Sequence, residues 1–131
     1  MRKAVIGKEY LLTSEVTRNK LAVTVESGEL EVFATPMMIA AMEKASSLCI
    51  KEFLDDGETT VGTYIEVSHT SATPLGMKIF VKAVIMSVNG REIEFEVEAS
   101  DEKGIIGKAK HKRFVVNSEK FQNKTNQKLQ E

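Results

Sequence analysis

Three side chains with acid–base or hydrogen-bonding chemistry could meet in one pocket. His69 ends an alternating apolar run over 61–67, and the period of two that a strand imposes points its ring toward the buried face. Thr35 precedes Pro36 at the expected start of one long helix, and Glu43 lies at the rim of the buried stripe of that helix. Together, a carboxylate, a hydroxyl and an imidazole can orient a substrate, attack it or activate water, and transfer protons.

Each of the three also has a purely structural explanation. The Thr35 hydroxyl could cap the helix by accepting a free amide of its first turn, and His69 could be a core histidine with a backbone partner. Glu43 could be a solvated helix acid, although Ile39 and Ile50 flank it on the helical wheel. All three lie at element ends or rims, where they can converge, and this favours the functional interpretation.

The helix is expected from Thr35-Pro36 to just before Asp55-Asp56-Gly57. Its apolar stripe recurs at spacings of three and four residues and consists of Met38, Met42, Ala45, Cys49 and Phe53. The chain has one cysteine, so no internal disulfide can form. Its place in the stripe makes it a small buried hydrophobe rather than a reactive thiol.

Beyond Gly57 the apolar period changes from that of a helix to that of a strand. Four strands are expected, around residues 61–67, 77–85, 93–99 and 105–111. Asn89-Gly90 and Lys103-Gly104 mark hairpins. If odd-numbered residues are buried on both strands of the hairpin at Asn89-Gly90, its loop must contain an odd number of residues. We therefore expect a three-residue loop ending on a left-handed Gly90, which places Lys82 opposite Glu96.

The remaining segments complete an α+β fold in which a mostly antiparallel sheet wraps one helix. Small Gly107 and Ala109 lie on the buried face, where the helix can approach closely. A short strand is expected at 21–25, the first 20 residues show no clear period, and 118–131 should be a frayed or loosely helical tail. Unprotected sheet edges favour a homodimer that joins sheets.

Charged side chains fill the outer face of the expected sheet. We expect them to form a solvated cross-strand lattice rather than a phosphate-binding patch: Lys78, Lys82, Glu92, Glu94, Glu96, Glu98, Lys108, Lys110 and Lys112.

Composition limits the classes of partner. A chain of 131 residues with 42% hydrophobic residues fits one domain, 1–131. The formal charge of −1 argues against nucleic acid as a partner. No signal-peptide core or membrane span is expected, which indicates a cytoplasmic protein. The two histidines lie far apart and no Cys-x-x-Cys spacing occurs, so no metal site is expected. Glycine-rich phosphate loops and a Gly-x-Ser-x-Gly motif are also absent from the sequence.

Four segments between about residues 30 and 117 carry a resemblance to a known family. They are Phe33-Ala34-Thr35 with the helix that carries Glu43, Thr60-Val61-Gly62-Thr63, Ser68-His69-Thr70-Ser71-Ala72-Thr73-Pro74, and His111-Lys112-Arg113-Phe114-Val115-Val116. In order and spacing they resemble the hotdog-fold thioesterases of the fluoroacetyl-coenzyme A type. The resemblance implies a helix wrapped by an antiparallel sheet, and a homodimer or dimer of dimers with sites at its interface. It also implies hydrolysis of acyl-CoA with no cofactor besides the coenzyme A of the substrate.

The resemblance also assigns roles. Thr35, Glu43 and His69 match the catalytic threonine, glutamate and histidine of the family, and Gly62 matches a glycine whose backbone lines the site. We expect Glu43 to attack the thioester carbonyl or to activate water, Thr35 to orient the reacting groups, and His69 to move protons to the thiolate. Gly62, which lacks a Cβ, should let a backbone amide approach the oxyanion.

Further substrate contacts are expected from Thr70, in the same motif as His69, and from Met38 and Met42, which could line an acyl channel as well as fill the core. The segment before Val32 would form part of a lid over a short acyl group.

Other functions remain open at this point. A non-catalytic module that binds acyl-CoA or an acyl carrier would keep the pocket without turnover. A hotdog hydratase or dehydratase would use an acid and a histidine on an enoyl substrate and release no thiol. A purely structural dimerisation domain would leave the inward-facing His69 without a purpose. The complete Thr/Glu/His set favours the thioesterase.

Overall fold

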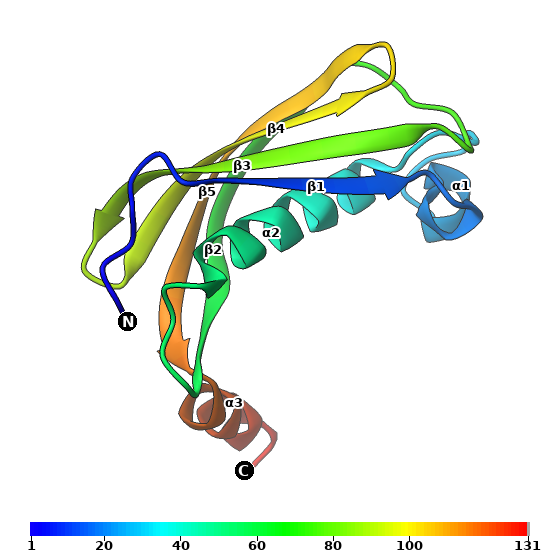
Figure 1. Ribbon diagram of the computed structural model, residues 1–131. Coiled ribbons are helices and arrows are strands. Elements are labelled where there is room, and N and C mark those ends of the chain that lie inside the picture. Colours follow the sequence, from blue (N-terminus) through cyan, green and yellow to red (C-terminus); the bar gives the residue numbers. More distant parts are fainter. Residues whose placement is uncertain (131) are drawn as a thin grey trace.

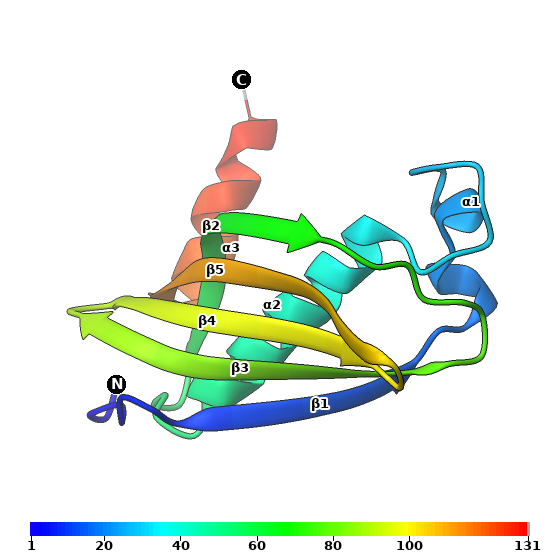
Figure 2. The same ribbon diagram turned by 90° about the horizontal axis from the view of Figure 1, so that it is seen from above.

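The computed structural model describes residues 1–130 as an antiparallel sheet curled around the helix α2 (Thr35–Lys51) (Figure 1). The sheet has five strands in the order β1-β3-β4-β5-β2. Their bounds are β1 Glu9–Glu15, β2 Glu58–His69, β3 Lys78–Asn89, β4 Glu92–Asp101 and β5 Gly104–Asn117. The helix runs obliquely beneath the strands (Figure 2), so the sheet wraps the helix as expected.

Helix α2 begins where the apolar stripe predicts it, but it ends at Lys51, so Phe53, the last residue of the predicted stripe, lies beyond the helix. Met38, Met42, Ala45 and Cys49 are buried beneath the sheet, and Lys44 lies on the exposed side. The predicted cap is wrong, because Ala34 occupies the N-cap position and Thr35 is the first helical residue, with no side-chain cap. The Thr35 hydroxyl is therefore available for another partner.

The hairpin between β3 and β4 brings odd-numbered residues of both strands to the buried face, but not through the predicted three-residue loop. Asn89 pairs directly with Glu92, so the loop holds two residues rather than three. A register shift between Ile85 and Ser87 adds the odd residue inside the strand instead. Lys82 consequently pairs with Glu98 and not with Glu96. Gly90 is left-handed as expected, with φ 62°.

Strand β5 packs tightly against its surroundings at Gly107. A Cβ built there would lie 2.5 Å from the Ser68 carbonyl oxygen and 2.8 Å from Met38 Cε, so only glycine fits without a shift of the backbone, as its place on the buried face predicts. A register shift between Ala99 and Ser100 changes the parity at the start of β5, so that Ile106 is buried and Ile105 is 48% exposed. The expectation that Ile105 faces the core is wrong for this reason.

The first 34 residues differ most from expectation. The segment 21–25 is not a strand, because only Leu21 finds a β-partner, in one bridge to Phe33, and the helix α1 (Ala22–Val25) follows it. A strand that was not predicted, β1, pairs with β3 along the edge of the sheet. Exposed Leu11 on its outer face hides the alternation of the strand.

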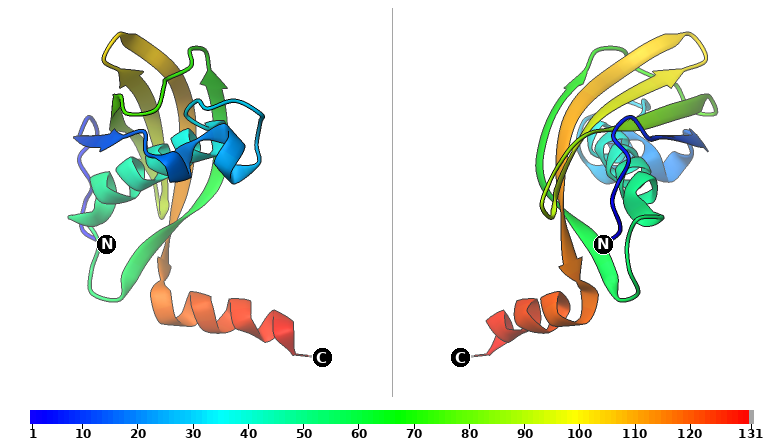
Figure 3. Two further views of the ribbon diagram at one scale, coloured as in Figure 1. Left: turned by 90° about the vertical axis from the view of Figure 1, so that its right-hand side faces the viewer. Right: turned by 60° about the vertical axis from the view of Figure 1, so that its left-hand side comes forward.

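The C-terminal segment stands away from the sheet. The helix α3 (Ser118–Asn126) and the 3-10 turn η2 (Gln127–Leu129) extend from the end of β5 (Figure 3) and bury no side chain. The tail is therefore helical and solvent-exposed. Within residues 1–130, none of the helices has the length and hydrophobicity needed to cross a membrane.

Candidate active site

The structure brings Thr35 and His69 into direct contact. Thr35 begins α2 and His69 ends β2, and Thr35 Oγ1 lies 2.8 Å from His69 Nδ1. Both residues line a cavity of about 290 Å³. Its other walls come from α1 and from the segments before α2 and after β2: Ala22, Ser27, Val32, Phe33, Thr70, Ser71 and Ala72.

The surroundings of His69 favour a neutral imidazole. Burial lowers its pKa below the ordinary value of 6.5, so the uncharged ring predominates at neutral pH. The ring of Phe33 meets it edge-on at 6.4 Å between centroids. His69 Nε2 is buried and has no hydrogen-bond partner among residues 1–130. A buried ring nitrogen of this kind is costly, and a bound substrate group could satisfy it.

Glu43 lies in a second group of residues around the middle of β2. Its side chain is 44% exposed, as the rim position predicts, and Oε2 is 3.6 Å from Arg113 Nη1. A Cβ built at Gly62 would lie 2.8 Å from the same oxygen. Glycine at this position therefore makes room for the carboxylate, and the expected approach of its backbone to an oxyanion stays a prediction.

Arg113 is a buried cation held by a hydrogen-bond network that is not predicted from the sequence. Its Nε donates to Thr60 Oγ1 at 2.8 Å and its Nη2 to the Thr60 carbonyl at 3.0 Å. Burial lowers the pKa of Arg113, and the Glu43 carboxylate opposes that shift. The hydrogen bonds to Thr60 fix the Arg113 guanidinium in place, and its ion pair with Glu43 therefore orients the carboxylate.

His111 completes this network with a defined tautomer. Its Nδ1 lies 2.8 Å from the Tyr64 carbonyl, which can only accept, so Nδ1 carries the proton. Burial lowers the pKa of His111, so Nε2 is unprotonated and accepts from Arg113 Nη1 at 3.2 Å. The alternation of β5 could have indicated this group, because it places Arg113 on the same buried face as Ala109 and His111.

The remaining predicted site residues take different places. Thr70 lines the same cavity as Thr35, with its hydroxyl donating to the Ile106 carbonyl at 3.3 Å. Met38 and Met42 are fully buried in the core, so their lining of an acyl channel stays a prediction.

Within residues 1–130 of one chain, no hydrogen bond or ion pair joins Glu43 to Thr35 or His69. The chain thus presents a hydroxyl–imidazole pair and, separately, an oriented carboxylate.

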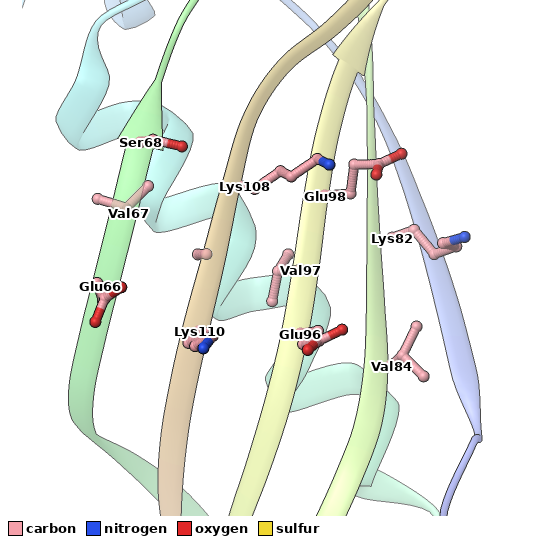
Figure 4. Close-up of a pocket in the computed structure, with 11 residues that line it drawn as sticks. Glu66, Val67, Ser68, Lys82, Val84, Glu96, Val97, Glu98, Lys108 and Lys110 are labelled. Atoms are coloured by element: carbon pink, nitrogen blue, oxygen red, sulfur yellow. The ribbon is translucent and has the colours of Figure 1, made fainter.

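A larger hollow of about 550 Å³ lies on the sheet face turned away from α2 (Figure 4). Its charged walls are the alternating glutamates and lysines of the outer lattice, in which Glu96 pairs with Lys110 and Glu98 with Lys108 across the strands. Neither histidine lines this hollow.

Comparisons with known proteins agree on one relationship. The sequence profile of the fluoroacetyl-CoA-specific thioesterases matches residues 16–119. The fluoroacetyl-CoA thioesterase of Streptantibioticus cattleyicolor is 43% identical over 98 residues, which cover 75% of this chain and 70% of that protein.

Solved structures extend the similarity to the whole fold. A mutant of a fluoroacetyl-CoA-specific thioesterase superimposes with a TM-score of 0.91 at 36% identity, over 98% of this chain and 99% of that one. A thioesterase superfamily member from Thermus thermophilus reaches 0.89 at 29% identity, over 97% of this chain and 94% of that one. A hot-dog-like protein from Thermanaerovibrio acidaminovorans reaches 0.85 at 20% identity, over 94% and 91%, and shows the fold alone.

Proposed function

The chain belongs to the family of fluoroacetyl-CoA-specific thioesterases and has the hotdog fold, and we propose that it hydrolyses a short acyl-CoA thioester through Thr35, Glu43 and His69. As an acyl-CoA thioesterase, it adds water to the carbonyl carbon, breaks the carbon–sulfur bond and releases the free acid and coenzyme A. The reaction needs no cofactor besides the coenzyme A of the substrate. A cytoplasmic location, in which Cys49 stays reduced, is part of the proposal.

One observation carries the assignment, the 2.8 Å contact between Thr35 Oγ1 and His69 Nδ1 inside a cavity. A neutral imidazole beside a hydroxyl can accept a proton released from the attacking water, and the imidazolium so formed can pass that proton to the leaving thiolate. The buried Nε2 gives the ring a second position at which a substrate atom can bind. The cavity of about 290 Å³ is at the small end of ligand sites, which favours a short acyl group.

Glu43 supplies the attacking group in this proposal. It either attacks the thioester carbonyl or removes a proton from the water that does so. Both steps need the carboxylate in a fixed place, and its ion pair with the buried Arg113, at 3.6 Å, holds it there.

We propose that a homodimer unites the carboxylate with the hydroxyl–imidazole pair. Strand β2 is an edge strand of 12 residues, and its Tyr64 is 48% exposed, so the edge invites pairing. Antiparallel pairing of two β2 edges about a two-fold axis would bring the His69 end of one strand beside the Gly62 region of the other. Glu43 of one subunit would then face Thr35 and His69 of its partner.

A thiol-release assay tests the activity and the site together. The panel should run from acetyl-CoA and fluoroacetyl-CoA to longer and aromatic acyl-CoAs. Glu43→Ala and His69→Ala should each lower kcat by orders of magnitude and leave the thermal unfolding curve near that of wild type, because both side chains are partly exposed. If either folded variant keeps full activity, its catalytic role is wrong.

Complementation tests the shared site. Glu43→Ala and His69→Ala chains, co-expressed with different tags, should form heterodimers with one intact site and one doubly mutated site. A statistical mixture should recover about a quarter of wild-type activity. If each site came from one subunit, every site would carry one substitution and no activity would return.

A further inference from the structure

Asp101 is a buried acid that the proposed mechanism does not use. It ends β4 and is 9% exposed. Its Oδ1 accepts the backbone amide of Lys103 at 2.8 Å, and its Oδ2 accepts the Thr73 hydroxyl at 2.8 Å. A carboxylate is costly to bury, and both of these hydrogen bonds hold segments near the turn between β4 and β5.

Thr73 connects this carboxylate to the start of α2. It is fully buried in the loop that follows His69. While its hydroxyl donates to Asp101, its carbonyl accepts the backbone amide of Phe33 at 2.8 Å. Phe33 lies two residues before Thr35, and its ring packs edge-on against the imidazole of His69.

The other half of the pair is tied to the same hairpin. The Ile106 carbonyl, near the start of β5, accepts the backbone amides of Thr70 at 2.7 Å and Ser71 at 3.3 Å. These two residues follow His69 directly. The hairpin of β4 and β5 therefore holds both ends of the Thr35–His69 contact, one through Thr73 and one through Ile106.

We infer that Thr73 and Asp101 are positioning residues, which hold the start of α2 against the end of β2 so that Thr35 meets His69. The inference rests on the proposed function of that pair. A hydroxyl–imidazole contact acts only over a narrow range of distance, and a misplacement of about 1 Å can lower a rate by about a hundredfold. Loss of the Thr73 hydroxyl frees Phe33 and the start of α2 from their anchor on β4.

The test compares Thr73→Val with Thr73→Ser, because valine keeps the shape of threonine and serine keeps its hydroxyl. With acetyl-CoA as substrate, Thr73→Val should lower kcat by about tenfold or more and change KM little, since the residue touches no substrate. Thr73→Ser should restore kcat to near the wild-type value. Asp101→Asn, which removes the charge and one hydrogen-bond acceptor, should also lower kcat, as Thr73→Val does.

Stability needs its own control. Ile93→Val removes one methylene from the buried start of β4, the end opposite to Asp101, and should lower the melting temperature without changing kcat. All assays are run well below the lowest melting temperature of the set. A fall in kcat that Ile93→Val reproduces at equal loss of stability would overturn the inference.

A measurement without turnover separates this inference from the proposed function. The imidazole ¹⁵N and ¹H signals of His69 should shift in Thr73→Val and return in Thr73→Ser. Unchanged His69 signals together with unchanged kcat in Thr73→Val would overturn the positioning role. If His69→Ala itself keeps full activity, the proposed function fails, and the His69 signals still report whether Thr73 positions the ring.

Discussion

Replacing Gly62 by alanine should disable the Glu43 carboxylate without unfolding the protein. The added Cβ would lie 2.8 Å from Glu43 Oε2, whereas an ordinary contact begins near 3.4 Å. The carboxylate must therefore move by at least about 0.6 Å, and the end of a flexible glutamate side chain can do so cheaply. This movement takes it out of the position that its ion pair with Arg113 defines.

The expected loss in kcat is about 10- to 100-fold, because misplacing a reacting group by about 1 Å costs up to a hundredfold. This corresponds to about 1.4–2.7 kcal/mol of activation free energy. Stability should change by less than about 1 kcal/mol, because alanine restricts the unfolded chain and Gly62 has no positive φ. The neighbouring His111 Cε1 at 3.3 Å and Arg113 Nη1 at 3.4 Å leave only mild crowding.

Thiol release from acetyl-CoA and a thermal unfolding curve are the two measurements. A double-mutant cycle gives the control, because Gly62→Ala should add almost nothing to the loss already caused by Glu43→Ala. Full activity in a folded Gly62→Ala protein would refute the reasoning. An equal additional loss in the Glu43→Ala background would show that the methyl group acts on something other than the carboxylate.

Four further outcomes are expected. Thr35→Val should lower kcat by about a hundredfold, and Thr35→Ser should recover most of it, because serine keeps the hydroxyl beside the imidazole. Since burial lowers the pKa of His69 below 6.5, a pH–kcat profile should fall as the ring becomes protonated below that value and stay level just above neutral pH. Burial lowers the pKa of His111 as well. As the pH falls, both histidines therefore become protonated in the unfolded chain at a higher pH than in the folded chain, and the free energy of unfolding measured in urea should decline below pH 6.5. Gly107→Ala should lose about 1–3 kcal/mol of stability in the same urea titration, since its methyl group would lie 2.5 Å from the Ser68 carbonyl oxygen; an unchanged midpoint would contradict the close packing.

Local periodicity was enough to predict the elements that carry the candidate site. The stripe of α2 and the alternation in β2 to β5 each repeat over many residues, so the helix, the strands and most of their buried faces could be predicted. The start of β5 is the exception, because a register shift there exposes Ile105. The short N-terminal elements could not. Exposed Leu11 hides the alternation of β1, and the β-branched residues of α1 indicate a strand although no neighbouring strand pairs with them.

The sequence by itself determined which side chains of the long periodic segments face inward, including His69 at the end of β2 and Gly107 on the face of β5 turned toward α2. Only the tertiary structure decided which of them meet. It joined Thr35 to His69 instead of to the helix amides, and it placed Glu43 beside Gly62 and Arg113. Periodicity specifies a direction from the local backbone, whereas the distance between two side chains depends on strand register, bulges and the curl of the sheet, which arise from contacts between segments far apart in the chain.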